Sequence, residues 1–426
     1  MTDAPLLWLQ NLTLLQGPEH PARCGDALLN SQGELVALDG DARQLAVAHG
    51  LVGRDGNGWW LAPSLVDPHS VLEQPLLGRA ETISSLAASA AAGGYGQVAL
   101  LPWGQPPRDH PSQLELHWPQ PLQLHLWGSL CQGDREQELA PQSELLAAGA
   151  IGLAGTAELP PLNLLERSLQ LGEMEQRPVL LAPRLRNLAG DGLVRQRVEA
   201  LRGGWPVDPP SSETLPLMTL LDLQERHPDR QLVAMTISTA EAVEMLGRAR
   251  QRPRATVHWW HLLSDSGSLP PSSNGWRLEP PLGGPDDRNA LRQAVRDGLI
   301  DAVAVHHQAL DPEEQLLPID QRRAGLAGHG LVLPLLAQAL VSEAGWPLDT
   351  LWKALCWGPS QLLGVPTPRL DAGSRNWLLF DPHRVWHWTP STSASLAANQ
   401  PLAAGTEVIG QIVASGLLPQ DHWHLD

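Results

Sequence analysis

The stretch that decides the fold is Trp60-Leu61-Ala62-Pro63-Ser64-Leu65-Val66-Asp67-Pro68-His69-Ser70-Val71. An apolar run leads here into an acid, a proline and a histidine, as at the end of a buried strand. Side chains two residues apart on an extended chain point the same way, so imidazoles at 69 and 71 could bind one metal ion together. Val71 offers no lone pair. The stretch therefore offers a single imidazole, His69, at a predicted strand end.

Downstream of this stretch, strand-like apolar runs alternate with spacers long enough for helices. The eight runs are at residues 60–66, 97–101, 122–126, 150–153, 179–181, 232–235, 255–257 and 302–305. Two spacers carry helix signals: residues 82–92 are alanine-rich and stop at Gly93-Gly94, and residues 239–246 follow a capping threonine. Eight strands alternating with helices predict an α/β fold, the (β/α)8 TIM barrel, over residues 61–366.

The two ends of the chain show a different pattern of apolar and turn residues. Residues 6–52 mix short apolar runs with turn residues, which is typical of short strands in a small sheet. Strands return beyond Pro366, where Asn376 to Phe380 predicts a strand that ends in a turn at Asp381-Pro382. We therefore expect residues 1–60 and 367–426 to build one small β domain together.

The composition indicates which kinds of partner and which cellular compartment to expect. The 426 residues carry 46 acidic and 29 basic side chains, a formal net charge of -17, which disfavours nucleic acids and anionic membrane surfaces. We find no secretory signal and no apolar run near the ~18 residues of a membrane helix, so we expect a soluble cytoplasmic protein. The three cysteines, widely spaced, form neither a disulfide framework nor a zinc-binding spacing.

Several motifs together resemble the dihydroorotase family, cyclic-amide hydrolases of pyrimidine biosynthesis that are related to hydantoinases and allantoinases. The matching segments are Pro63 to His69, Glu81-Thr82-Ile83, Ile237-Ser238-Thr239, Pro280-Pro281-Leu282, Asp297 to Asp301 and Gly325 to Gly330. Their order and spacing agree from about residue 6 to residue 417. The resemblance implies a barrel of the amidohydrolase type, a small β-sandwich built from both termini, and one or two zinc ions at the strand ends.

The chain departs from the family at most metal positions. Two histidines of the family correspond to Ala182 and Thr236, and its bridging aspartate or carbamylated lysine corresponds to residues 153–156. The single lysine, Lys353, lies far downstream in a predicted helix. By the resemblance, His69 and His261 remain as candidate metal ligands, and His306 stands in place of the aspartate that acts as general base.

The substrate positions differ as well. The arginine that holds the substrate carboxylate in the family corresponds to Glu73, which would repel a carboxylate. The family's asparagine and second arginine correspond to Trp103 and Gly283. Dihydroorotate is therefore not expected in the usual pose, and the substrate-binding residues stay open.

Two hypotheses follow. The first is an inactive homologue that needs no cofactor and acts as a scaffold or binding subunit, with aspartate transcarbamoylase as the partner that the resemblance implies. The second is an enzyme that uses a reduced mononuclear zinc site, with His69 and His261 as ligands and His306 as ligand or base, and that hydrolyses a neutral or cationic cyclic amide. Family members commonly form homodimers, so a dimer is compatible with both.

Overall fold

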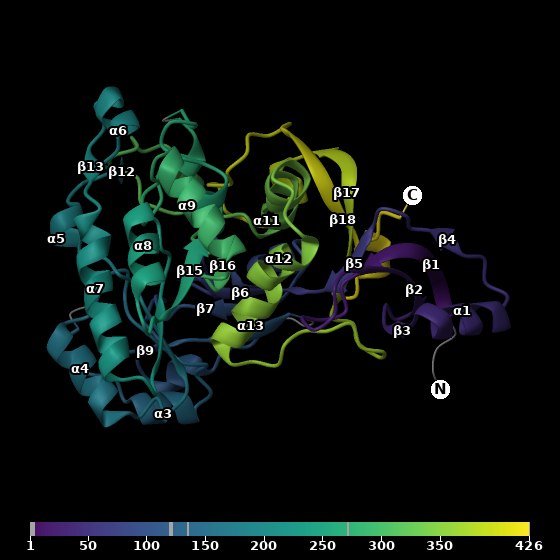
Figure 1. Ribbon diagram of the computed structural model, residues 1–426, viewed down its shortest axis with the longest axis horizontal. Coiled ribbons are helices and arrows are strands. Elements are labelled where there is room, and N and C mark those ends of the chain that lie inside the picture. Colours follow the sequence, from purple (N-terminus) through teal and green to yellow (C-terminus); the bar gives the residue numbers. More distant parts are fainter. Residues whose placement is uncertain (1–4, 119–121, 134–135, 271, 426) are drawn as a thin grey trace.

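The barrel forms as predicted in the computed structural model, which describes residues 5–118, 122–133, 136–270 and 272–425 (Figure 1). Its strands are β6 (Leu65–Ser70), β7 (Tyr95–Leu100), β8 (Gln123–Leu126), β9 (Gly128–Ser129), β10 (Leu153–Ala154), β11 (Pro178–Leu181), β14 (Gln231–Ala234), β15 (Arg254–His258) and β16 (Ala302–Ala304). All neighbouring pairs are parallel. Because only Trp127 separates β8 from β9, the two short strands fill one position, and all eight predicted runs have a strand.

Two backbone hydrogen bonds close the barrel between its first and last strands. The amide of His306 donates to the carbonyl of His69 at 3.1 Å, and the amide of Val71 donates to the carbonyl of His307 at 2.7 Å. The Asp67 side chain supports the same seam, since its Oδ1 accepts the amide of Val305 at 3.0 Å. The residues after β6 and β16 are therefore held side by side at one end of the barrel.

Helices surround the barrel strands. They include α2 (Ile83–Ala92), α3 (Gln142–Ala147), α4 (Leu162–Leu171), α7 (Ser211–Arg226), α8 (Ala240–Arg248), α9 (Pro285–Arg296), α11 (His329–Leu336), α12 (Leu348–Trp352) and α13 (Gly358–Leu363). Shorter elements on the connecting segments are α5 (Arg186–Ala189), α6 (Val198–Gly203), α10 (Pro312–Gln315), β12 (Val194–Arg195) and β13 (Val207–Asp208). α11 and α12 each continue into a π-helical segment, Ala337–Glu343 and Lys353–Trp357.

The predicted starts of α2 and α8 are confirmed. Thr82 caps α2 by accepting the amide of Ser85, and Thr239 caps α8 by accepting the amide of Ala242. Gly93 follows the last residue of α2, as expected. Within the described ranges, no helix combines the length and apolar character that crossing a membrane requires.

The two ends of the chain meet in one mixed sheet beside the barrel, purple and yellow in Figure 1. Its strands are β1 (Pro5–Leu14), β2 (Arg23–Asn30), β3 (Leu35–Leu38), β4 (Arg54–Asp55), β5 (Trp60–Pro63), β17 (Trp377–His387) and β18 (Glu407–Ser415), and α1 (Asp39–Ala48) packs nearby. β5 joins the halves, because it pairs with β1 on one side and β17 on the other. The fold class is thus the predicted one, while the boundaries at 60 and 366 remain predictions.

One detail of the sequence prediction is wrong. β17 does not end at Asp381-Pro382 but continues to His387 along β18. The register shifts between Asp381 and Val385, so an irregularity in the strand accommodates the proline. Pairing with β18 therefore overrides the local turn signal.

Candidate functional site

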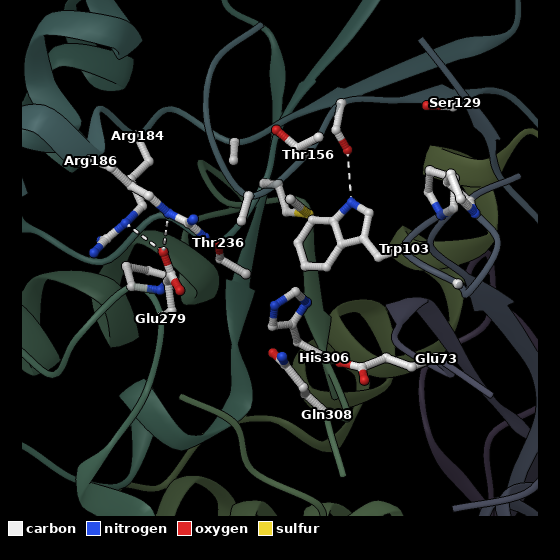
Figure 2. Close-up of a pocket in the computed structure, with 18 of the residues that line it drawn as sticks. Glu73, Trp103, Ser129, Thr156, Arg184, Arg186, Thr236, Glu279, His306 and Gln308 are labelled. Atoms are coloured by element: carbon white, nitrogen blue, oxygen red, sulfur yellow. Dashed lines mark hydrogen bonds and ion pairs between the residues drawn. The ribbon is translucent and has the colours of Figure 1, made fainter. Parts of the chain in front are cut away.

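A cavity of about 520 Å³ opens at the carboxyl ends of the barrel strands (Figure 2). Its lining includes Glu73, Trp103, Thr156, Ala182, Thr236 and His306, together with Arg184, Arg186, Arg195, Glu213, Glu279 and Gln308. The first six are positions that the sequence assigns to metal, base or substrate. The structure therefore gathers the replaced positions at one site, although they come from different strand ends.

A chain of hydrogen bonds reaches the floor of this cavity from the barrel interior. The amide of Thr236 donates to Thr256 Oγ1 at 2.9 Å, and Thr256 Oγ1 lies 2.9 Å from His69 Nε2. His69 Nδ1 lies 3.0 Å from His306 Nδ1. Both ring nitrogens of His69 are thus already engaged by neighbouring side chains.

Two further histidines lie behind His306. The His258 ring centre is 6.0 Å from that of His306 and 5.6 Å from that of His261. His258 Nδ1 accepts the amide of Trp260 at 3.0 Å, and His261 Nε2 lies 3.3 Å from the carbonyl of Pro281. The His258 ring therefore lies near both His306 and His261, two of the three histidines that the sequence places at one ion.

Burial keeps all four imidazoles uncharged at neutral pH. Desolvation lowers the pKa of His261 and of His306 to about 4. The pKa values of His69 and His258 fall well below the ordinary range for the same reason, and neighbouring histidines lower them further. His306 is consequently a neutral group at this position, where the family has a negatively charged carboxylate.

The donor set does not fit the zinc centre that the resemblance implies. A neutral imidazole has one lone pair, and those of His69 and His258 already lie against hydrogen-bond donors. His261 Nδ1 is buried without a hydrogen-bond partner in the described part of the chain. Across the described ranges, no three His, Cys, Asp or Glu side chains are grouped to hold an ion, whereas catalytic zinc takes three protein ligands.

Val71 is buried, and Lys353 is exposed on its helical segment with its Nζ beside Gly298, so neither supplies a ligand to the cavity. Lys353 does lie on a helical segment, as the sequence predicted, and the absence of a bridging carbamate remains a prediction. The assignment of His69 and His261 as metal ligands and of His306 as catalytic group remains a prediction.

The cationic groups in the cavity wall are matched by carboxylates. Arg184 lies 3.1 Å from Asp208 and 3.0 Å from Glu279, and Arg195 lies 3.1 Å from Asp208. Figure 2 shows Glu279 shared by Arg184 and Arg186. On the opposite side, Glu73 forms an ion pair with Arg323. Sequence reasoning missed these arginines, and the wall offers no unpaired cation among its described residues for a carboxylate ligand.

Thr256 and His258 were also missed as site residues. Both lie on β15, directly before the motif Trp259 to Leu262. Residues two apart on a strand have their side chains on the same face. That alternation was the available signal, because it places both side chains on one side of β15.

The acids at the barrel seam, Asp67 and Glu81, have structural partners. Its Oδ2 lies 3.1 Å from His329 Nε2, and Glu81 Oε2 lies 3.2 Å from His307 Nε2. Both pairs are buried, so these groups hold the seam rather than face the cavity.

Comparison with solved structures defines the class of fold. The L-hydantoinase (dihydropyrimidinase) from Arthrobacter aurescens superposes with a TM-score of 0.75 at 18% identity, covering 97% of this chain and 94% of the other. A dihydropyrimidinase from Brevibacillus agri gives 0.73 at 16% identity, over 96% and 94%. The protein therefore has the amidohydrolase type of barrel with its small β domain.

Comparison of sequences narrows the class to a family. A probable dihydroorotase-like protein from Synechocystis sp. is 34% identical over 404 residues, 86% of this chain and 90% of the relative. A dihydroorotase-like protein from Pseudomonas aeruginosa is 30% identical over 341 residues, 77% and 79% of the two chains. This chain belongs to the dihydroorotase-like proteins. No family model matches it.

Proposed function

We propose that this dihydroorotase-like protein no longer hydrolyses cyclic amides and serves as a binding or scaffolding subunit. The observation that carries the proposal is the state of His69, the histidine kept at the first strand end. Both of its ring nitrogens are engaged, and its expected companion is Val71. A side chain in this state supports neither a pair of zinc ions nor the activation of water by them.

The substrate side of the cavity supports the same proposal. A carboxylate such as that of dihydroorotate would meet Glu73, and Arg184 and Arg195 already pair with Asp208. Binding it would require either breaking buried ion pairs or accepting an uncompensated negative charge, and both are costly. The partner that fits the family resemblance is aspartate transcarbamoylase.

The alternative function is a cyclic-amide hydrolase with a mononuclear zinc site. It is favoured by His261 Nδ1, a buried nitrogen without a partner in the described part of the chain, and by the proximity of His258 and His306. Such an enzyme would need His69 to give up its bond to Thr256, and its substrate would be uncharged or cationic.

Metal content and activity, measured on one preparation, separate these functions. Protein purified without added metal should contain far less than one zinc per chain and should not open the dihydroorotate ring, with or without added Zn²⁺. It should comigrate with aspartate transcarbamoylase from the same organism in size-exclusion chromatography, and His69→Ala should do so equally. Near-stoichiometric zinc, with hydrolysis that His69→Ala abolishes, would establish the enzyme instead.

A further inference from the structure

The hydrogen bonds around Thr256 determine where the protons of the buried imidazoles reside. Thr256 is fully buried, and its hydroxyl has two neighbours within hydrogen-bond distance in the described part of the chain, the Thr236 amide and His69 Nε2. The amide can only donate. The hydroxyl hydrogen must therefore go to His69 Nε2, because a buried hydroxyl without an acceptor would lose a hydrogen bond.

The proton positions of the two histidines follow in turn. With Nε2 as an acceptor, an uncharged His69 carries its proton on Nδ1, which lies 3.0 Å from His306 Nδ1. His306 must then accept through Nδ1 and carry its own proton on Nε2. We call this series of four groups, Thr236 amide, Thr256, His69 and His306, the relay.

The free end of the relay faces the cavity. His306 lines the cavity and is only 5% exposed, and among the described residues its Nε2 has no hydrogen-bond partner. The Trp103 ring stands edge-on to it, with centres 5.8 Å apart, and uses its own N–H to bond the carbonyl of Gly155 at 2.9 Å. In Figure 2 the His306 ring lies directly below that of Trp103. A donor that faces the cavity beside an apolar ring is thus available to a ligand.

The backbone conformation at both ends of the relay also indicates a binding site. Thr236 has φ +54° and His306 has φ +46°, a left-handed region that is unusual for residues other than glycine and especially so for a β-branched threonine. Both residues line the cavity. Such conformations persist where the surrounding structure enforces them, and they concentrate at binding sites.

We propose that the relay fixes His306 as an N–H donor, through Nε2, for the carbonyl oxygen of an uncharged small molecule held against Trp103. Thr256 is the positioning residue, because its hydroxyl sets the proton on His69 and thereby on His306. The wall favours an uncharged ligand, since Arg184 and Arg195 are already paired with carboxylates and Glu73 is already paired with Arg323. The inference rests on the proposed function in one respect: the ligand is bound rather than hydrolysed.

The proton positions can be measured by NMR on full-length protein labelled with ¹⁵N at histidine, with signals assigned by His69→Gln and His306→Gln. We expect the proton of His69 on Nδ1 and that of His306 on Nε2. Thr256→Val should disturb this pattern at both histidines, whereas Thr256→Ser should preserve it. Thr219→Val, a threonine on α7 away from the cavity, serves as the control. A proton on His306 Nδ1 in the unaltered protein would overturn the relay.

Ligand preference can be measured with a matched pair of probes. We expect 2-pyrrolidone, an uncharged lactam, to shift the His306 Nε2 signal in a saturable way, and to bind at least about tenfold more weakly to Thr256→Val. Pyroglutamate, the same ring with a carboxylate, should bind at least about tenfold more weakly than 2-pyrrolidone. No shift with the lactam, or tighter binding of pyroglutamate, would refute the ligand assignment.

The two proposals fail separately. A zinc-containing hydrolase with the expected proton positions would overturn the proposed function and leave the relay intact. An inactive protein with the opposite proton positions would do the reverse.

Discussion

Among the single residues around the cavity, Arg195 is the one whose charge is most deeply buried. Arg195 is fully buried, and its guanidinium contacts Asp208, Ser212 and Ser238, with Glu213 3.5 Å away. Its charge is matched by two carboxylates that are just as buried. Nothing in the sequence marks this arginine as different from the exposed ones, because pairing of this kind depends on the folded chain.

Replacing Arg195 with Ala should destabilise the protein by about 3–5 kcal/mol, because the buried Glu213 would lose its counterion and the buried Asp208 would keep only Arg184. The comparison is Arg248→Ala, which removes an exposed pair with Glu244 on α8 and should cost less than about 1 kcal/mol. Urea unfolding of both variants measures the difference. Equal free energies of unfolding would show that Arg195 contributes no more than a surface ion pair.

At the scale of helices and strands, the sequence predicted the end of an element correctly where the contacts that stabilise this end come from neighbouring residues in the chain. The start of α2 was predictable because Thr82 and Ser85 cap the helix within one turn. The end of β17 was not, because its continuation past Pro382 depends on β18, which lies some distance further along the chain. Local sequence predicts helix ends better than it predicts strand ends for this reason.

Removing the α2 cap with Thr82→Ala should lower the free energy of unfolding by about 1 kcal/mol, since the amide of Ser85 loses its acceptor. Thr82→Ser keeps a hydroxyl at the same position and should recover most of that loss. Chemical denaturation monitored by circular dichroism measures both. An alanine variant as stable as the unaltered protein would show that the cap contributes nothing.

At the scale of the whole molecule, burial holds several imidazoles in the uncharged form. Burial lowers the pKa of His69, His125, His258, His261, His306 and His329. In the unfolded chain the same groups titrate near 6.5. The stability that they confer is therefore complete above that pH, and it is lost as the pH falls because protons bind preferentially to the unfolded chain.

The free energy of unfolding should consequently decrease between pH 7.5 and pH 5.5, an interval in which carboxylates of ordinary pKa stay ionised. His306→Gln should reduce this dependence, because the pKa of His306 lies at about 4 in the folded protein. His383→Gln, at an exposed position, should leave it unchanged. Urea titrations at several pH values test the expectation, and a stability that is constant or rises on acidification would contradict it.

The sequence by itself determined the barrel, the shared terminal domain and the family, because repeating apolar runs and ordered motifs are properties of residue identity. It also determined that Val71 and Ala182 cannot bind a metal, since neither side chain has a donor atom. Only the tertiary structure decided how the surviving histidines are used. His69 and His306 are 237 residues apart, and Thr256 reaches them from a third strand. A hydrogen bond tolerates only a few tenths of an ångström of variation in its donor–acceptor distance. The closed barrel positions these side chains that accurately, and no spacing along the chain could do so.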